Sequence, residues 1–433
     1  MNLVNGKVVE TIPNGYIKND LAKSIIETLA GDELDVKMVV DACGKLVKSI
    51  KFETFSEIAS DLALPEYVVE AYYQQLKSMF SKKALKQRLE KELGKGYDRA
   101  HCLKLPNKDA RVYEQIKPLG VLFHIAAGNV DGLPAYSVIE GLLTGNVNIL
   151  KLPTQADGGL TIQLLLRLIE IEPMLKNYIY VFDYSSEEKQ RIKELIELAD
   201  AVVVWGSDSA TASLRNIVPP NVKLIEWGHK ISFTYATIKG MSKANMVKLA
   251  QHICETDQLL CSSCQGIYVD TDEMEELDRL AEKFQKILNQ VAKKYPRTVD
   301  LGISSKLSLQ LLDEELDAID NRQRLLKNAD SAVIVYYDSE LTTSYMYRTV
   351  WMKRLPRRDF LHVIRKHKNH LQTISLLCKQ KETEELRQLV LKTGIVKVVD
   401  ALNMSSSYCG EPHDGEFSLR RYTRIVNWEE NSK

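Results

Sequence analysis

A polar turn with two cysteines separates a predicted helix from a predicted strand. The helix runs from Lys243 to Leu260, and the strand begins at Gly266. The thiol of Cys261, at the tip of this turn, can be partly exposed and close to backbone N–H groups. Both conditions favour the thiolate, which is the nucleophilic form of cysteine. The turn therefore indicates a catalytic cysteine, whereas core cysteines more often lie within apolar runs, as Cys378 does.

Cys261 and Cys264 also form a Cys-x-x-Cys pair, which has two other interpretations. Half of a metal site would need two further ligands, but neither a second Cys-x-x-Cys nor a His-x3-His follows. A redox pair of the thioredoxin type would open a helix, whereas this pair closes one. We therefore predict no metal site, and Cys264 remains the alternative nucleophile.

The composition favours an α/β enzyme over a nucleic-acid or membrane protein. The 433 residues suffice for two or more domains. The 58 basic and 58 acidic residues cancel, which argues against a protein built to bind nucleic acid or an anionic membrane. No apolar run approaches the roughly 18 residues that span a bilayer, and Met1 to Lys7 lack the apolar core of a signal peptide. Together with seven scattered cysteines, these features predict a cytoplasmic protein.

Residues 117–205 alternate between short apolar strands and helices. The first strand lies within residues 117–129, in an apolar run bounded by glycines that is typical of a buried parallel strand. The elements that follow are predicted at 135–143 (helix), 147–152 (strand), 158–171 (helix), 178–182 (strand), 186–198 (helix) and 201–205 (strand). This alternation implies right-handed crossovers and an open parallel sheet.

Small and basic residues stand at the carboxyl ends of these strands, where parallel sheets bind ligands. Gly128 and Asn129 follow the first strand, Lys151 ends the second, and Gly206 and Ser207 follow the fourth and open a helix. A helix N-terminus favours a phosphate. The alternative is that Gly206 and Ser207 form only a turn and an N-cap. The G-x-G-x-x-G fingerprint of ordinary dinucleotide sites is absent from the sequence.

Four segments are predicted along the chain. They are a mostly helical N-terminal segment (1–95), a nucleotide-binding α/β domain (96–228), a catalytic domain with the cysteine nucleophile (229–400) and a C-terminal strand and tail (401–433). Within the third segment we expect helices at 304–312 and 358–369 and a strand at 371–376. Partial alternation over 419–428 resembles an edge strand, which pairs either between subunits or within the chain.

Taken together, these residues resemble the aldehyde dehydrogenase superfamily. The matching positions, in order and spacing, are Pro118-x-Gly120, Ile125, Asn129, Gly145-Asn146 with Lys151, Gly206-Ser207, Glu226-x-Gly228-x-Lys230 and Cys261. The resemblance implies an aldehyde dehydrogenase-like α/β fold, with a parallel-sheet nucleotide-binding domain and an α/β catalytic domain.

Within that superfamily, the chain looks most like the LuxC-type acyl-CoA reductases of bacterial bioluminescence operons. The resemblance covers about residues 100–430 and rests on His124-Ile125-x-x-Gly128-Asn129, Gly141-Leu142-Leu143-x-Gly145-Asn146, Gly228-x-Lys230-Ile231-Ser232-Phe233, Cys261-Ser262-Ser263-x-Gln265 and His413-Asp414-Gly415. Three departures stand out. Thr211 replaces a superfamily glycine, Cys264 stands where the luminescence enzymes tend to have proline, and no Glu-x-Phe-Gly-Pro precedes Arg348.

The resemblance implies reduction of a long-chain fatty acyl thioester to an aldehyde, with NADPH as cofactor and NADH as the alternative. Cys261 would form the acyl-enzyme, and the Asn129 amide and the Cys261 backbone N–H would stabilise the oxyanion. Lys151, Gly206, Ser207 and Gly128 would hold the cofactor.

Two residues have two alternative roles in this scheme. Glu226 occupies the place of the general base of hydrolytic aldehyde dehydrogenases, a base on which acyl reductases of this kind do not depend. His413 either reaches the site or is a turn residue.

The implied acyl donor is an acyl-CoA or an acyl-protein, with an acyl-protein synthetase or acyltransferase as partner and a homo-oligomer as the expected assembly. Two alternatives remain open. One is a dehydrogenase that forms acid, with Glu226 activating water. The other is a non-catalytic subunit that binds an acyl chain, although a degenerate site would have lost one of Cys261, Asn129 and Lys151.

Overall fold

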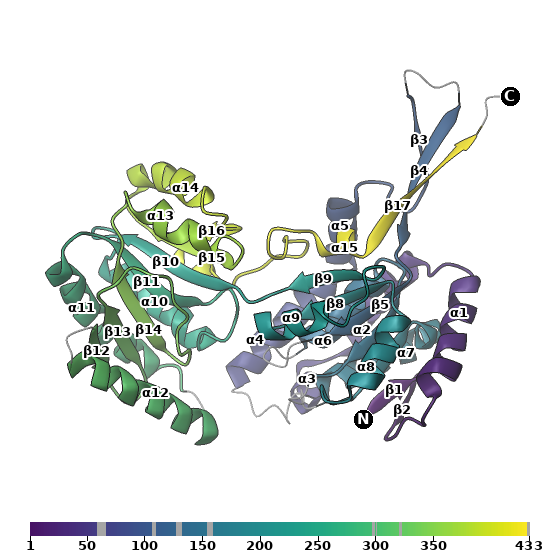
Figure 1. Ribbon diagram of the computed structural model, residues 1–433, viewed down its shortest axis with the longest axis horizontal. Coiled ribbons are helices and arrows are strands. Elements are labelled where there is room, and N and C mark those ends of the chain that lie inside the picture. Colours follow the sequence, from purple (N-terminus) through teal and green to yellow (C-terminus); the bar gives the residue numbers. More distant parts are fainter. Residues whose placement is uncertain are drawn as a thin grey trace. The chain divides into compact units, whose positions relative to one another are not determined.

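The computed structural model describes residues 1–58, 66–105, 110–126, 132–153, 159–296, 299, 301–319 and 323–430. The chain forms two compact units (Figure 1): unit 1 contains residues 1–228 and 408–433, and unit 2 contains residues 229–407. This division differs from the four predicted segments, because the N-terminal helices and the C-terminal tail both belong to unit 1. In the sequence, unit 2 is thus inserted between the two segments that form unit 1.

Unit 1 contains a seven-stranded sheet in the order β2-β1-β7-β6-β5-β8-β9. Its strands are β1 (Asn2–Val4), β2 (Lys7–Val9), β5 (Val121–Ile125), β6 (Val147–Lys151), β7 (Ile179–Phe182), β8 (Ala201–Trp205) and β9 (Lys223–Trp227). The strands from β7 to β9 in this order run parallel, and β1 is antiparallel to β7. Strands β6, β7 and β8 are wholly buried, as expected for a parallel sheet covered on both faces. The predicted parallel sheet is therefore confirmed.

The N-terminal helices share one apolar core with the helices that connect the parallel strands. The N-terminal helices are η1 (Ile17–Leu21), α1 (Ala22–Ala30), α2 (Val36–Ser49), α3 (Phe52–Ile58), α4 (Glu66–Phe80) and α5 (Lys82–Leu93), and the later helices of unit 1 are α6 (Leu133–Leu142), α7 (Leu160–Ile171), η3 (Pro173–Asn177), α8 (Lys189–Glu197), α9 (Asp208–Arg215) and α15 (Ser418–Arg421). Because this core is continuous, the N-terminal segment belongs to the same compact unit as the parallel sheet.

A buried ionic network joins α5, α6 and α15. The Arg88 guanidinium pairs with Glu92 at 2.6 Å and with Glu140, and it donates to the Ser418 hydroxyl at 2.8 Å. The backbone N–H of Leu419 donates to the second oxygen of Glu92 at 3.0 Å. Buried charges are tolerated when they are paired and hydrogen-bonded in this way. The network therefore fastens the C-terminal segment to the N-terminal half of unit 1.

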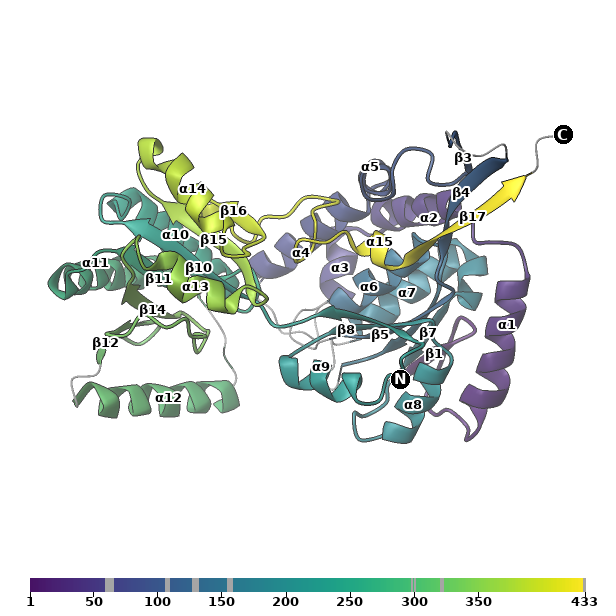
Figure 2. The same ribbon diagram turned by 45° about the horizontal axis from the view of Figure 1, so that its top comes forward.

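Three strands of unit 1 form a separate antiparallel ribbon in the order β17-β4-β3, and they lie side by side in both views (Figures 1 and 2). They are β3 (His101–Leu103), β4 (Arg111–Pro118) and β17 (Thr423–Glu430). Strand β17 pairs with β4 along its whole length, from Thr423 opposite Pro118 to Glu430 opposite Arg111. The predicted C-terminal strand therefore pairs within the chain through this edge.

Unit 2 contains a second seven-stranded sheet, in the order β12-β13-β14-β11-β10-β15-β16. Its strands are β10 (Ile231–Thr237), β11 (Cys264–Asp270), β12 (Gln323–Lys327), β13 (Ala332–Tyr336), β14 (Thr349–Arg354), β15 (Leu371–Leu377) and β16 (Lys397–Val399). All neighbours are parallel except β12, which is antiparallel to β13.

The helices of unit 2 differ from the predicted ones mainly in their ends. They are α10 (Lys243–Thr256), α11 (Met274–Ala292), α12 (Leu301–Ile319), α13 (Phe360–Ile364), η4 (Arg365–His367), η5 (Gln380–Glu382), α14 (Thr383–Leu391) and η6 (Ala401–Asn403). The helix predicted at 304–312 is longer in the structure, and the one predicted at 358–369 is a short α-helix followed by a 3₁₀ turn. Within the described part of the chain, no helix combines the length and apolarity needed to cross a membrane.

Candidate active site

Cys261 lies on a tight turn between α10 and β11, as predicted, although the helix ends at Thr256 and not at Leu260. Two residues, Asp257 and Gln258, reverse the chain in the left-handed region, with φ of 44° and 62°. The Ser263 N–H then donates to the Leu260 carbonyl at 2.9 Å, and the Leu260 N–H donates to the Ser263 hydroxyl at 3.2 Å. This closed turn leaves the Cys261 side chain exposed.

Polar residues from two neighbouring strands hold Cys261. The Ser232 hydroxyl of β10 donates to the Cys261 carbonyl at 2.7 Å and accepts from the Thr373 N–H of β15 at 3.0 Å. The Gln372 side-chain amide donates to the Cys261 sulfur at 3.2 Å. The sequence analysis did not find Ser232 or Gln372 as site residues, because a polar residue inside a strand carries no distinctive pattern.

Cys264 has a different environment from Cys261. Its side chain is fully buried, and its sulfur lies 3.2 Å from both the Thr234 hydroxyl and the Gly266 carbonyl. Burial raises the pKa of the Cys264 thiol to about 12. A buried, protonated thiol is a poor nucleophile. The geometry therefore favours Cys261 over Cys264 and gives no support to an exposed redox pair.

A nearby histidine, His252, is engaged by the backbone. Its Nε2 accepts the Cys264 N–H at 3.3 Å, and burial lowers its pKa to about 4. The ring is therefore neutral near pH 7, and the nitrogen that could act as a base is occupied. His252 positions the start of β11 and is not placed to deprotonate Cys261.

A buried ion pair braces the turn. The Arg348 guanidinium, almost fully buried, donates from Nε to Asp257 Oδ1 at 2.6 Å, and the Tyr347 N–H donates to the Asp257 carbonyl at 2.8 Å. Met346, Tyr347 and Arg348 all have left-handed backbones, with φ between 47° and 67°. Non-glycine residues adopt this conformation at an energetic cost that surrounding contacts must offset. Two left-handed segments, 257–258 and 346–348, are thus joined by the Arg348–Asp257 pair next to the Cys261 turn.

In unit 1, the described candidate cofactor residues lie at the carboxyl edge of the parallel sheet. Lys151 ends β6, Gly206 and Ser207 follow β8, and Glu226 is the last residue but one of β9. The strand order reverses between β5 and β8, since β6 and β7 extend the sheet to one side and β8 and β9 to the other. Open α/β sheets bind ligands at such a reversal. Gly128 and Asn129 are outside the described residues.

Lys151 is buried, with its ammonium donating to the Leu152 carbonyl at 2.9 Å. Burial lowers the pKa of Lys151, against the opposing effect of the carboxylates of Asp183 and Glu188. Ser207 caps α9 by accepting the Ala210 N–H at 3.3 Å. A buried cation and a helix N-terminus are suitable groups for the phosphates of a dinucleotide.

Glu226 is held in an ion pair. Its two oxygens accept from the Arg215 guanidinium at 2.5 and 2.6 Å. In this arrangement both carboxylate oxygens of Glu226 are directed at Arg215. This pairing weighs against Glu226 as a general base.

Two residues of the segments that resemble LuxC-type reductases, His124 and Gly141, have roles in packing inside unit 1. His124 on β5 is fully buried between the Ser137 hydroxyl at 2.7 Å and Asn148 Oδ1 at 3.0 Å. Burial lowers its pKa to about 4. A Cβ at Gly141 would overlap the Asn148 side chain that holds this ring. The requirement for glycine at this position is therefore steric.

His413 packs against two tryptophans at the carboxyl edge of unit 1. Its ring centre lies 4.8 Å from that of Trp205 on β8 and 5.1 Å from that of Trp227 on β9. The next residue, Asp414, has a left-handed backbone with φ of 49°. His413 is therefore both a turn residue and a neighbour of the candidate cofactor edge.

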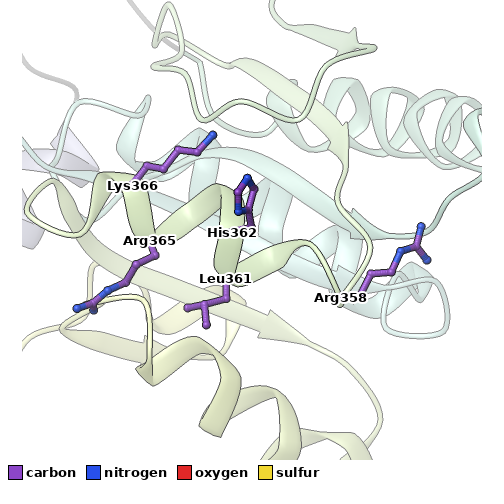
Figure 3. Close-up of a pocket in the computed structure, with 5 residues that line it drawn as sticks. All are labelled: Arg358, Leu361, His362, Arg365 and Lys366. Carbon is purple, nitrogen blue, oxygen red and sulfur yellow. The ribbon is translucent and has the colours of Figure 1, made fainter.

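A shallow cavity of about 610 Å³ lies on α13 and η4 of unit 2, lined by Arg358, Leu361, His362, Arg365 and Lys366 (Figure 3). Two of its cations already face carboxylates: Arg358 pairs with Asp272, and Lys366 lies 3.3 Å from Glu340. None of the five lining residues is a predicted site residue.

Comparisons with known proteins identify the family of the chain. A family model described as acyl-CoA reductase (LuxC) matches residues 32–425. The long-chain acyl-protein thioester reductase of Vibrio harveyi is 25% identical over 354 residues, covering 81% of this chain and 72% of that protein. The reductase of the same name from Aliivibrio fischeri is 24% identical over 333 residues, covering 75% and 67%.

The solved structures show the fold. A protein described as methylmalonate-semialdehyde dehydrogenase, from Sinorhizobium meliloti and in complex with NAD, superimposes with a TM-score of 0.74 at 14% identity, covering 100% of this chain and 97% of that one. An oxidoreductase from Marinobacter aquaeolei gives a TM-score of 0.74 at 12% identity, covering 99% and 94%. The fold is aldehyde dehydrogenase-like, as expected from the resemblance.

Proposed function

Because the chain belongs to the LuxC family of acyl-CoA reductases, whose activity is oxidoreductive, we propose that it reduces a long-chain fatty acyl thioester to the aldehyde with NADPH, through a covalent bond between the acyl group and Cys261. The observation that carries this proposal is an exposed cysteine whose sulfur accepts a hydrogen bond from Gln372 and whose carbonyl is held by Ser232. The donor is an acyl-CoA or, as the names of the relatives suggest, an acyl-protein.

The first half of the reaction transfers the acyl group. The Cys261 thiolate attacks the thioester carbonyl, a C–S bond forms, and the carbonyl oxygen gains negative charge. The Asn129 amide and the Cys261 backbone N–H are the proposed donors to that oxyanion, because donors aimed at developing charge contribute most to rate. The tetrahedral intermediate collapses, and the donor's thiolate leaves and takes a proton.

The second half needs a hydride, which NADPH supplies when it is bound. Lys151, Gly206, Ser207 and Gly128 are the residues proposed to hold it, and the buried Lys151 ammonium and the capped start of α9 fit an anionic dinucleotide. The acyl-enzyme must also be protected from hydrolysis. The Arg215–Glu226 pair supports the reductase over the acid-forming dehydrogenase, since it engages the carboxylate that would activate water.

Intact-mass spectrometry tests the acyl-enzyme. Wild-type protein and the variants Cys261→Ala and Cys264→Ala would be incubated with a long-chain acyl-CoA in the absence of cofactor. We expect one acyl adduct on the wild type and on Cys264→Ala, and none on Cys261→Ala, because only Cys261 of this pair is exposed. NADPH and NADH would then be compared for their ability to discharge the adduct to aldehyde.

An adduct that persists in Cys261→Ala would contradict the assignment of the nucleophile. A wild type that forms no adduct with either an acyl-CoA or an acyl-protein would contradict the acyl-enzyme route. Adduct discharge that yields acid in place of aldehyde would favour the dehydrogenase alternative.

A further inference from the structure

Two consecutive residues of β15 are linked to Cys261, Gln372 directly and Thr373 through Ser232. The Gln372 amide nitrogen lies 3.2 Å from the sulfur. The N–H of Thr373 donates to Ser232, which in turn donates to the Cys261 carbonyl. Gln372 and Ser232 are both buried, so neither side chain is free to rotate into solvent. The sulfur and the amide are therefore fixed relative to each other through the same strand.

The backbone of β10 is irregular where it supplies Ser232. Its register shifts between Ser232 and Thr234 against β11, and between Ile231 and Phe233 against β15. An irregularity of this kind redirects a side chain that regular alternation would place elsewhere, and such irregularities are frequent next to active sites. The distortion lies at the residue that holds Cys261, which indicates that this corner of the sheet is shaped around the cysteine.

We propose that Gln372 is a catalytic residue, whose side-chain N–H stabilises the negative charge on the Cys261 sulfur before acyl transfer and again when the aldehyde leaves. The inference rests on the proposed function. In the last step the alkoxide formed by hydride addition re-forms the carbonyl double bond, and the C–S bond breaks with its electron pair returning to sulfur. The same amide hydrogen bond then stabilises the departing thiolate.

A neutral amide suits this role. A hydrogen bond to the charged form of a group favours that form. The glutamine donates at every pH and, unlike histidine or lysine, does not titrate with the thiol. The titratable and charged groups on the elements around the turn have other partners: Asp257 pairs with Arg348, His252 accepts the Cys264 N–H, Cys264 is buried, Lys230 donates to the Asn369 carbonyl, and His370 contacts the His229 carbonyl.

The rate of Cys261 alkylation by iodoacetamide, followed as a function of pH by peptide mass spectrometry, tests the proposal directly. The proteins compared would be the wild type, Gln372→Leu, the isosteric Gln372→Glu and, as a matched control, Thr373→Val. The Thr373 hydroxyl is buried and has no hydrogen-bond partner among the described residues, so its loss leaves the contacts of Cys261 unchanged.

We expect the midpoint of the alkylation profile to rise by about one pH unit in Gln372→Leu, the size of one hydrogen bond to a charged group. It should rise further in Gln372→Glu, which replaces the donor with a negative charge, and stay unchanged in Thr373→Val. The plateau at high pH should not fall, because a thiolate without its donor is at least as nucleophilic. Acylation by acyl-CoA near pH 7 should slow by about tenfold in Gln372→Leu.

A lower plateau with an unchanged midpoint would overturn the proposal, since it would mean that Gln372 only positions the turn. An unchanged profile in both Gln372 variants would overturn it as well. The alkylation profile does not depend on acyl chemistry. A wild type that is alkylated but never acylated would therefore contradict the proposed function separately from the effect of Gln372 on the thiol.

Discussion

Unit 1 and unit 2 each contain a seven-stranded, mostly parallel sheet, but they place their candidate functional residues at opposite edges. In unit 1, Lys151, Gly206 and Ser207 lie at the carboxyl ends of β6 and β8. In unit 2, Cys261 precedes β11, and its two partners are the second residues of β10 and β15, at the amino ends of three adjacent strands. The rule that ligands bind at carboxyl ends applies to the first sheet. Applied to the second sheet, the same rule would point to its carboxyl edge, whereas Cys261 lies at the amino edge.

The difference has a physical origin. The carboxyl edge of unit 1 offers a buried cation and the N-terminus of α9, which are general features of α/β sheets that suit an anion. The amino edge of unit 2 relies on individual side chains and on a constrained turn. Variants at the two edges should therefore have separable effects, which the following predictions test in order of expected size.

The largest effect is expected from the Asp257–Arg348 ion pair beside the Cys261 turn. Arg348→Met leaves Asp257 without its buried partner, and breaking a buried pair in this way costs about 3 kcal/mol of unfolding free energy. Chemical denaturation would measure the loss, and alkylation of Cys261 would report the altered turn. Arg358→Met is the matched control, because its pair with Asp272 is exposed and screened by solvent, so its loss should change stability far less. Equal losses in the two variants would contradict a special role for the brace.

A second prediction concerns the stability of both units at acidic pH. His124 in unit 1 and His252 in unit 2 are buried, with pKa values lowered to about 4 from 6.5. Between these two pH values the unfolded chain binds protons that the folded chain does not, so the stability these groups contribute is present above pH 6.5 and is lost as the pH falls towards 4. Each histidine accounts for at most about 3 kcal/mol.

Denaturation of the wild type and of His252→Gln at pH 7 and at pH 4.5 would measure this acid sensitivity. The variant should lose less stability between the two pH values than the wild type does. Identical losses would show that His252 does not carry the sensitivity of unit 2.

The smallest effect is expected from a variant at the carboxyl edge of unit 1, which should change cofactor binding without changing acyl transfer. Lys151→Met should weaken binding of NADPH by about tenfold, because one charged contact is lost, and should leave acyl adduct formation in the absence of cofactor unchanged. Binding would be followed by titration calorimetry, with the exposed Lys176→Met as control. If Lys151→Met instead abolished the adduct while binding NADPH normally, the assignment of the two edges to cofactor and acyl transfer would be wrong.

The elements that the sequence predicts correctly are those whose pattern of apolar and polar residues reflects burial. The buried strands of unit 1 are continuous apolar runs, and the turn that carries Cys261 was predicted because polar residues separate a helix from a strand. It missed β4, which carries mixed polar residues and is a strand because β17 pairs with it more than 300 residues later. It also missed β14, whose buried Lys353 is stabilised by Asp338 at 2.8 Å, a partner that no local pattern reveals.

The candidate site residues divide in the same way, into those with a local sequence pattern and those that depend on distant partners. The sequence placed Lys151, Gly206 and Ser207 at one sheet edge because strand order along the chain implies it. Ser232, Gln372 and the Asp257–Arg348 pair were not found, because each depends on a contact between the segment 257–263 and a residue 29 to 111 positions away in the sequence.

The buried network around Arg88 has a consequence for synthesis of the protein. Glu92 and Glu140 are made early, but Ser418 and Leu419, which complete their hydrogen bonds, follow the whole of unit 2. While the chain is being synthesised, the buried ionic network of unit 1 therefore lacks Ser418 and Leu419 until unit 2 has emerged from the ribosome. Unit 2 emerges as one continuous segment and can fold before unit 1 is complete. Domains generally fold in the order of their synthesis. In this chain the inserted unit can be complete before the unit that surrounds it.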